Sequence, residues 1–387
     1  MRFFHMADLH IGKKLNHVSL LEDQQYMLAQ TVELIRQQKP DVLLLAGDVY
    51  DRRNPAVEAV QLLDDFLSQV VLECHVPVLA ISGNHDSGER LGFAHNILSR
   101  AGLHIAGRLS LPVPNVTIED KWGPVTFHLL SYGDLATLKY ALQTEDALDY
   151  QQAMEQVLQT MNLDSSDGHR HVLLAHGVVA GSDELQYCDS ERELTIGGTE
   201  FWSSSLLTGF SYVALGHLHS CQRSGSDVVR YAGSPLKYSF SEEHHQKGIL
   251  QVDLAADGTA EITQLPLVPL RDMRTIRGEL TDLLQDKVVQ SANADDFIRA
   301  ILTDYGELLE PMARLREKYP NALTLERENQ FQAEPMQDYK RIDLQNQTLG
   351  QLFADFYGQV TGGVMTDAEI AVLEDVVQTV QTLQEVE

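Results

Sequence analysis

Short apolar runs alternate with longer amphipathic stretches through the first part of this chain. The runs 2–7, 42–46 and 76–82 have the composition of buried strands, and the segments 19–38 and 56–73 between them carry apolar residues at helical spacing. Strands that are apolar along their whole length need cover on both faces, and helices in the crossover connections supply it. The alternation therefore predicts a layered α/β core.

Further along the chain the pattern becomes richer in strands and turns. The additional short strands are expected at 171–175, 212–215, 228–232, 248–253 and 259–265. We expect the last three to be consecutive and antiparallel, with Asp257-Gly258 as the hairpin turn between the final two. Together these strands predict a large domain in which two sheets pack face to face with helices outside.

Changes in composition and in the pattern of apolar residues divide the 387 residues into three parts. Pro266 and Pro269 mark the first boundary, beyond which strand-like and helical patterns alternate as in a small α+β unit. A polar linker at 332–346 precedes two amphipathic helices, the second opened by a capping box at 366–369. The expected domains are 1–265, 266–340 and 341–387.

Histidine, aspartate or asparagine follows directly after each of five predicted strands. The segments are Asp8-Leu9-His10, Gly47-Asp48-Val49-Tyr50-Asp51, Gly83-Asn84-His85-Asp86, His176-Gly177 and Gly216-His217-Leu218-His219. In α/β sheets ligands bind beyond the carboxyl ends of the strands, so the five segments are expected to meet at one rim. A single Gly-Asp is usually a turn, but all five segments in one chain are hard to explain as coincidence.

The chemistry of that rim follows from its residue types. Carboxylates, an amide oxygen and imidazoles form a mixed oxygen and nitrogen donor set, and no thiolate belongs to it, which argues against a structural zinc site. The donors are too many for one ion and suit two, which a shared carboxylate could hold roughly 3.5–4 Å apart. Imidazole-rich sites favour transition metals, so we expect manganese, with iron, zinc or magnesium as alternatives.

The charge of the chain, taken alone, argues against a nucleic-acid ligand, since 29 Lys and Arg face 56 Asp and Glu and the net charge is -27. Phosphate binding relies on basic residues. Bound divalent cations would invert the local field, and a basic partner chain could supply the main contact surface. No apolar run approaches the roughly 20 residues of a membrane span. With only three cysteines, a cytoplasmic protein without membrane contact is expected.

The order and spelling of these segments resemble the calcineurin-like metallophosphoesterase family. The longer matching stretches are MRFFHMADLHIGKKL, GNHDSGERLGF, YVALGHLH and YAGSPLKYSFSE. These stretches are similar to the nuclease subunits within that family, and the resemblance covers most of 1–265 and, more loosely, the rest. It implies a two-sheet sandwich with a two-metal centre.

The resemblance also implies the metal ligands. One metal would be held by Asp8, His10 and His219, and the other by Asn84, His176 and His217, with Asp48 bridging the two.

Five neighbouring residues receive roles, some from the resemblance and some from their side-chain chemistry beside the motifs. His85 resembles the family's non-ligand histidine beside the scissile phosphate and would protonate or stabilise the leaving oxygen. Asp51 stands where archaeal and eukaryotic relatives carry a histidine, so its role is open, and Asp86 could orient a ligand or be structural. Arg52 and Arg90 could bind phosphate or form surface ion pairs.

By resemblance, the function is that of a metal-dependent DNA nuclease subunit in repair and recombination, acting as a double-strand exonuclease and a single-strand or hairpin endonuclease. A homodimer is implied, with an ABC-type ATPase whose coiled coils would receive the C-terminal helices. The chain has no Gly-x-x-x-x-Gly-Lys-[Ser/Thr] loop, so ATP use must come from that partner.

Two alternatives stay open at this point. One is a protein or small-molecule metallophosphatase, because the segment 47–52 partly resembles the phosphoprotein-phosphatase motif. The other is a metal-binding scaffold that assembles a repair complex without cutting, although the complete ligand set argues against a degenerate site.

Overall fold

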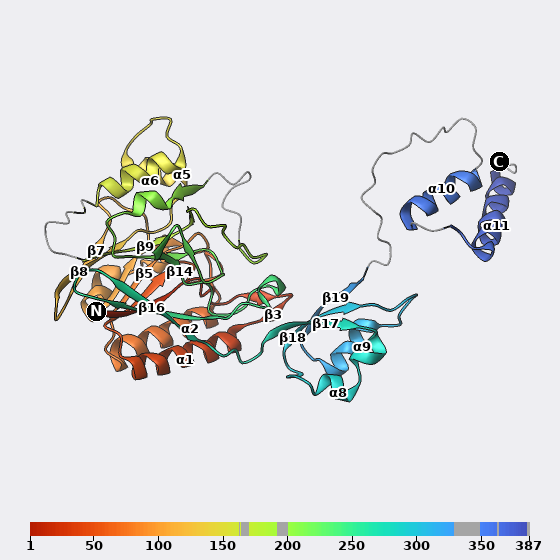
Figure 1. The fold of residues 1–387 in the computed structure, drawn as a ribbon, viewed down its shortest axis with the longest axis horizontal. Helices are drawn as coiled ribbons and strands as arrows, with labels where there is room; N and C mark the ends of the chain where they lie inside the picture. The colour runs from red at the N-terminus through yellow and green to blue at the C-terminus, as the bar shows by residue number, and fades with distance from the viewer. Residues whose placement is uncertain (162, 164–169, 192–199, 329–348, 362–363, 385–387) are drawn as a thin grey trace.

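Two six-stranded sheets packed face to face make up most of the first 266 residues. The computed structural model describes residues 1–161, 163, 170–191, 200–328, 349–361 and 364–384. Helices α1 (Leu21–Gln38) and α2 (Val57–Ser68) cover the outer face of one sheet, and α5 (Leu135–Leu142) and α6 (Tyr150–Gln159) cover the outer face of the other (Figure 1). This confirms the predicted α/β sandwich flanked by helices.

The first sheet has the order β16-β15-β1-β4-β5-β6. Its strands are β1 (Arg2–Met6), β4 (Val42–Ala46), β5 (Val78–Ile81), β6 (Leu103–Ala106), β15 (Gly248–Leu254) and β16 (Ala260–Pro266). Strands β1, β4, β5 and β6 are parallel, while β15 and β16 add an antiparallel edge. Helices α1 (Leu21–Gln38) and α2 (Val57–Ser68) supply the crossovers, and a π-helical turn (Gln69–Glu73) extends α2.

The second sheet has the order β13-β14-β12-β9-β8-β7. Its strands are β7 (Asn115–Asp120), β8 (Gly123–Leu129), β9 (Arg170–His176), β12 (Tyr212–Gly216), β13 (Gln222–Ser224) and β14 (Ser226–Tyr231). Helices α5 (Leu135–Leu142) and α6 (Tyr150–Gln159) pack on its outer face. The short elements are β2 (Lys14–Leu15), β3 (Val18–Ser19), α3 (Gly88–Leu91), α4 (His95–Leu98), η2 (Ser99–Ala101), β10 (Val178–Ala180), β11 (Phe201–Ser203), η3 (Ser204–Leu207) and η4 (Phe240–Glu242).

Strand β4 illustrates why its sequence is apolar throughout. Leu44 faces the layer between the two sheets, where Phe3 and Phe127 meet edge to face with ring centroids 5.8 Å apart. Leu43 and Leu45 point the other way, into the layer beneath the helices. Successive strand residues face opposite sides, so a strand buried on both faces has no place for a polar side chain. Its first polar residues therefore come where the strand ends.

One pairing prediction was wrong. Residues 228–232 were expected to pair antiparallel with 248–253, but β14 lies in the second sheet, parallel to β12 and antiparallel to β13. Strand β15 belongs to the first sheet and pairs antiparallel with β1. The segment between β14 and β15, which contains η4, is long enough to pass from one sheet to the other. The predicted hairpin between β15 and β16 is confirmed, with Gly258 in the left-handed region at φ 85°.

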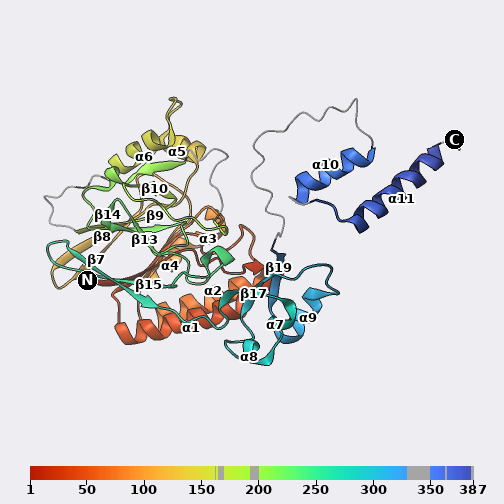
Figure 2. The same cartoon turned by 45° about the vertical axis from the view of Figure 1, so that its right-hand side comes forward.

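A smaller unit follows the sandwich, with a parallel three-stranded sheet and its own apolar core. Its elements are β17 (Met273–Gly278), α7 (Leu280–Leu283), α8 (Asp286–Val289), β18 (Phe297–Leu302), α9 (Pro311–Lys318) and β19 (Ala322–Arg327). The unit lies beside the end of the sandwich that carries β2 and β3 (Figure 1 and Figure 2). It is tied to the sandwich by ion pairs between Arg271 and Asp23 and between Lys237 and Asp272.

The last described elements are helices α10 (Leu349–Thr361) and α11 (Asp367–Gln384), which contact one another. The predicted capping box is present, because Glu369 accepts the backbone N–H of Thr366 at 2.7 Å and its own N–H reaches the Thr366 hydroxyl at 3.4 Å. The predicted linker at 332–346 lies outside the described residues. None of the described helices combines the length and apolar composition needed to cross a membrane.

Candidate metal centre

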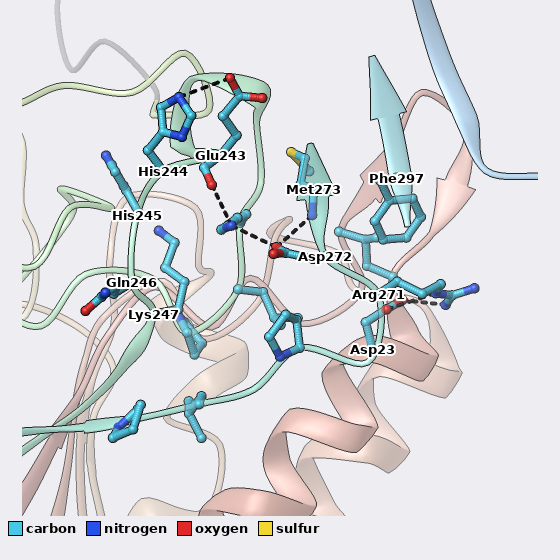
Figure 3. A pocket seen from close by; sticks show the side chains of 17 residues that line it. Asp23, Glu243, His244, His245, Gln246, Lys247, Arg271, Asp272, Met273 and Phe297 are labelled. Carbon is cyan, nitrogen blue, oxygen red and sulfur yellow. Dashed lines mark hydrogen bonds and ion pairs between the residues drawn. The ribbon is translucent and has the colours of Figure 1, made fainter. Parts of the chain in front are cut away.

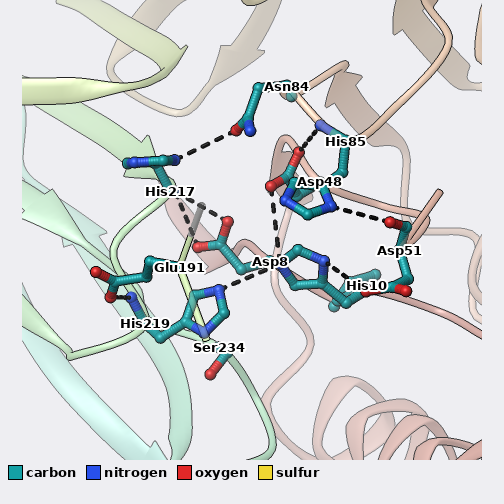
Figure 4. A network of polar contacts seen from close by, with 12 residues as sticks. Asp8, His10, Asp48, Asp51, Asn84, His85, Glu191, His217, His219 and Ser234 are labelled. Atoms are coloured by element: carbon teal, nitrogen blue, oxygen red, sulfur yellow. Dashed lines mark hydrogen bonds and ion pairs between the residues drawn. The ribbon is translucent and has the colours of Figure 1, made fainter. Parts of the chain in front are cut away.

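The carboxyl ends of β1, β4 and β5 in one sheet and of β9 and β12 in the other meet at one rim (Figure 4). All the residues predicted as metal ligands come together there, and each is at most 5% exposed. They are Asp8, His10, Asp48, Asn84, His176, His217 and His219. Burial of so many polar side chains costs free energy unless each has a partner, so the rim is built for a specific purpose.

The backbone at the rim adopts uncommon conformations. Asp8, His10, Asp48 and His217 have φ values of 54°, 43°, 47° and 107°, although none is glycine. Left-handed backbone of this kind costs a side-chain-bearing residue on the order of 1–3 kcal/mol and gathers at functional sites. The turns aim the side chains inward from the strand ends.

Two glycines allow the strand ends to approach closely. A Cβ atom at Gly47 would overlap the His176 ring, and one at Gly83 would overlap the Asp48 carboxylate. Glycine is required at both positions because any side chain would push the two polar groups apart.

One group of donors is formed by Asp8, His10 and His219, whose potential ligand atoms all lie within 4.8 Å of one another. The Nε2 atoms of His10 and His219 are 3.1 Å apart. The Asp8 carboxylate also accepts the backbone N–H of His217 through both oxygens, at 2.9 and 3.0 Å, which holds the β1 and β12 ends together.

A second group surrounds Asn84. Its Oδ1 atom lies 2.9 Å from Nε2 of His176 and 3.3 Å from Nδ1 of His217. Nδ1 of His176 donates to the backbone carbonyl of Ala46 at 2.9 Å, so Nε2 is the ring nitrogen that would bind a metal ion after losing its proton. A lone pair on one ring nitrogen and a hydrogen bond from the other is the form in which histidine binds metals.

Asp48 lies between the two groups. Its Oδ2 atom is 3.7 Å from Nε2 of His10 and 3.4 Å from Nε2 of His176, one histidine from each group. Its Oδ1 atom accepts the backbone N–H of His85 at 2.8 Å. A single carboxylate therefore reaches both donor groups.

The electrostatics of the rim suit cations. Burial lowers the pKa of His217 to about 3 and that of His219 to about 4, so both imidazoles are neutral near pH 7. Burial also raises the pKa of Asp8, with the Asp48 carboxylate adding to the shift. Within the described part of the chain, no Lys or Arg forms an ion pair with Asp8 or Asp48. Burial favours the neutral ring of His176, but the Asp48 carboxylate outweighs it and raises the pKa of His176 to about 9. A divalent ion between Asp48 and His176 would therefore displace the proton of that imidazole.

His85 and Asp51 stand at the edge of the rim. Nδ1 of His85 lies 2.9 Å from the backbone carbonyl of Asp51. The Asp51 carboxylate pairs with Lys13 at 3.0 Å and approaches Nδ1 of His10 at 3.6 Å. Asp51 thus touches His85 through its backbone and lies near His10 through its side chain.

The other predicted residues are placed differently. Asp86 is buried and accepts the backbone N–H groups of Val49, Tyr50 and Gly83 at 2.9–3.1 Å, so it joins the loops after β4 and β5. Arg52 is 76% exposed and lies 3.6 Å from Asp51. Arg90 is exposed and donates to Asn54 at 2.9 Å. Both arginines lie on the surface, outside the buried donor groups.

Sequence reasoning missed a set of residues behind His219. Glu191 accepts the backbone N–H of His219 at 2.7 Å, and Lys247 donates to its carbonyl at 2.8 Å. Ser190 lies 2.7 Å from the ring nitrogen Nδ1, and Glu242 accepts from Ser190. None of these residues follows an apolar strand directly, so the rule that found the other positions did not apply to them.

The comparisons with known proteins agree with this geometry. The family model of calcineurin-like phosphoesterases matches residues 1–221, and that of the type 5 capsule protein repressor C-terminal domain matches residues 269–361. The SbcD subunit of the nuclease SbcCD from Staphylococcus epidermidis is 30% identical over 361 residues, which cover 93% of this chain and 94% of that protein.

Solved structures with related architecture are more distant. A dimetal phosphatase from Danio rerio is 14% identical, with a TM-score of 0.39 over 65% of this chain and 92% of its own. A Thermus thermophilus protein is 11% identical, with a TM-score of 0.38 over 68% of this chain and 98% of its own. With TM-scores this low, neither structure supports a conclusion about the function of this chain.

The fold and the rim thus define a phosphoesterase of the calcineurin-like class. Within that class, the chain belongs to the SbcD family of nuclease subunits.

Proposed function

We propose that this chain is the nuclease subunit of an SbcCD-type complex, a hydrolase that cuts phosphodiester bonds in DNA during repair and recombination. The observation that carries the proposal is Asp48, whose carboxylate reaches a histidine of each donor group while its loop holds His85. A bridging carboxylate between two metal sites beside an imidazole is the arrangement that phosphate-ester hydrolysis needs.

Two divalent cations are proposed to occupy the rim. Asp8, His10 and His219 would hold one, and Asn84, His176 and His217 the other, with Asp48 shared. The imidazole content favours manganese, with iron, zinc or magnesium as alternatives. When bound, the ions would supply positive charge to the phosphate and an activated water as nucleophile.

His85 is proposed as the general acid. Its Nδ1 atom donates to the Asp51 carbonyl, so the ring must carry a second proton, on Nε2, to act as an acid. Transfer of that proton to the leaving oxygen would return the ring to the neutral form that the Asp51 carbonyl already stabilises. Asp51 is thereby proposed to orient His85 through its backbone, and His10 through its carboxylate.

Contacts to DNA are proposed at the surface beside the rim. Arg52 and Arg90 are exposed there and could contact phosphates on either side of the scissile bond. The net charge of -27 makes a basic partner and the bound cations necessary for DNA to approach. The small unit, here assigned to residues 266–340, would help to position the duplex.

The proposed partner is an SbcC-like ABC-type ATPase with coiled coils, and the proposed assembly is a cytoplasmic heterotetramer around a homodimer of this chain. The C-terminal part, 341–387, would dock on the ATPase. Helices α10 and α11 leave Phe353, Phe356, Val372 and Val376 at 47–65% exposure, and these apolar side chains suit a coiled-coil surface.

The proposal is tested with the purified chain, with and without its ATPase, on blunt and hairpin duplexes in manganese, magnesium or chelator. We expect manganese-dependent cleavage, strongest at duplex ends when the partner and ATP are present. Cleavage that resists the chelator, or no cleavage under any condition, would contradict it. Faster turnover of phosphoserine peptides than of DNA would instead favour the metallophosphatase alternative, which rests on the segment 47–52.

A further inference from the structure

Glu242 is completely buried behind His219, although it is far from it in sequence. Its carboxylate accepts a hydrogen bond of 2.5 Å from the Ser190 hydroxyl, and that hydroxyl lies 2.7 Å from Nδ1 of His219. A serine hydroxyl has one hydrogen. Ser190 gives that hydrogen to the Glu242 carboxylate, so the Ser190 oxygen can only accept a hydrogen bond from His219. The proton of the His219 ring must therefore be on Nδ1.

The carboxylate itself is firmly held. Its Oε1 atom also accepts the backbone N–H of Tyr238 at 3.1 Å, and its Oε2 atom accepts from Lys247 at 2.6 Å. The Lys247 ammonium forms a buried ion pair with this carboxylate, which favours its charged form. Glu242 is therefore an ionised, rigid acceptor.

The same carboxylate lies within 4.8 Å of potential ligand atoms of Cys188 and His245. A third metal ion there would have to displace Lys247 from Oε2 and Ser190 from Oε1. Because both carboxylate oxygens already accept hydrogen bonds, Glu242 is better explained as a partner of His219 than as a ligand of a separate metal ion.

We propose that Glu242 is a positioning residue that acts through Ser190 to hold the His219 ring in one orientation with Nε2 free to bind a metal ion. The inference rests on the proposed metal site. What the inference adds is the chain of contacts from Glu242 through Ser190, which keeps the proposed ligand His219 in the tautomer that can bind a metal ion. Partners of this kind behind a ligand histidine typically change metal affinity 10–100-fold.

The adjacent residue offers a matched control. Glu243 belongs to the same turn, yet its side chain faces the small unit, where it accepts from the Thr275 hydroxyl and lies 3.7 Å from Arg299. Glu243 lines a cavity of about 440 Å³ between the sandwich and the small unit, together with Met273 and Phe297 (Figure 3). Changing Glu243 to glutamine removes the same charge one residue away without touching His219.

The test measures Mn²⁺ binding to the full chain by calorimetry for Ser190→Ala, Ser190→Thr, Glu242→Gln and Glu243→Gln. Thermal melts in chelator check that each variant folds. We expect Ser190→Ala and Glu242→Gln to weaken one of two Mn²⁺ sites 10–100-fold and to leave the other within about threefold. Glu243→Gln and Ser190→Thr, which keeps the hydroxyl, should bind both ions as the unchanged chain does.

Glu242→Gln leaves the buried Lys247 ammonium without its carboxylate, so this variant could fail to fold. Ser190→Ala removes only the hydroxyl and keeps the ion pair between Glu242 and Lys247. The Mn²⁺ binding of this variant is therefore sufficient by itself to test the inference. Wild-type binding of both ions by Ser190→Ala would overturn the inference, as would the absence of Mn²⁺ binding in the unchanged chain. If the unchanged chain binds two ions without cutting DNA and Ser190→Ala still loses one, the proposed nuclease function fails while this inference stands.

Discussion

Nδ1 of His85 lies 2.9 Å from the backbone carbonyl oxygen of Asp51, so the ring is tied to the loop that follows β4. Nε2 has no hydrogen-bond partner among the residues that the structure describes. The ring plane also meets that of His10 at 89° with centroids 4.7 Å apart. His85 is therefore held by one nitrogen beside the proposed metal ligands, and the other nitrogen is available for the proposed proton transfer.

Replacing His85 by glutamine tests its role as an acid. Because an amide cannot supply a proton to the leaving oxygen, we expect kcat on linear duplex DNA to fall by about 10²–10⁴-fold. Mn²⁺ binding should be unchanged, since His85 is not among the proposed ligands. An unaltered kcat would contradict the role of His85 as an acid, and a loss of bound metal would make His85 a ligand. No cutting by the unchanged chain would favour the scaffold alternative.

Asp48→Asn tests the shared carboxylate. The substitution removes the negative charge that faces His10 and His176, so we expect Mn²⁺ at either site to bind at least tenfold more weakly. For the unchanged chain, Mn²⁺ at 100 times its dissociation constant should add about 2.7 kcal/mol to the free energy of unfolding, and chelator should remove it. At the same Mn²⁺ concentration, about half of this gain or less should remain in Asp48→Asn.

A control for this experiment is Asp227→Asn, which changes an exposed carboxylate that pairs with Arg223 in the same sandwich. We expect it to keep most of the Mn²⁺-dependent stabilisation. If both variants respond alike, the shared position of Asp48 is not what binds the ions.

Gly83→Ala tests the close approach of two strand ends. A Cβ atom there would overlap the Asp48 carboxylate, so the loop or the carboxylate must shift. We expect a loss of about 1–3 kcal/mol in the free energy of unfolding and weaker Mn²⁺ binding. Denaturation can be followed by fluorescence, because both tryptophans, Trp122 and Trp202, belong to the sandwich.

Gly350→Ala is the matched substitution in open space, since nothing lies within 4 Å of a Cβ atom at that helical position. It should leave both the unfolding of the sandwich and Mn²⁺ binding unchanged. Equal effects of the two substitutions would mean that the packing around Gly83 is not responsible.

The rim could be predicted from the sequence because each proposed metal ligand lies at or just after the end of a strand that is buried on both faces. In β4 the run of five apolar residues leaves Asp48 as the first side chain that can turn to the edge. The sheet in which β14 lies could not be predicted, because an apolar pattern records burial and does not name the neighbouring strand. Ser190 and Glu242 were missed for a related reason, since only the path of the chain between β14 and β15 brings that glutamate behind His219.

His5 gives the stability of the sandwich a pH dependence that does not involve the metals. Its ring is fully buried between the sheets, and Nδ1 lies 2.9 Å from the Tyr212 hydroxyl. Burial lowers the pKa of His5 to about 3, against 6.5 in an unfolded chain. Between these values the unfolded state binds one proton more, so the free energy of unfolding falls as the pH drops below 6.5.

The size of this effect can be measured by urea unfolding in chelator at pH 7 and pH 5. From the two pKa values, His5 should cost the folded state roughly 2 kcal/mol more at pH 5 than at pH 7. His5→Gln cannot take up that proton, so its stability should fall by about 2 kcal/mol less than that of the unchanged chain over the same interval. His244→Gln replaces a ring that is 90% exposed and should follow the unchanged chain. Because the other buried histidines are common to all three proteins, their contributions cancel, and identical pH slopes would show that His5 takes up its proton without unfolding.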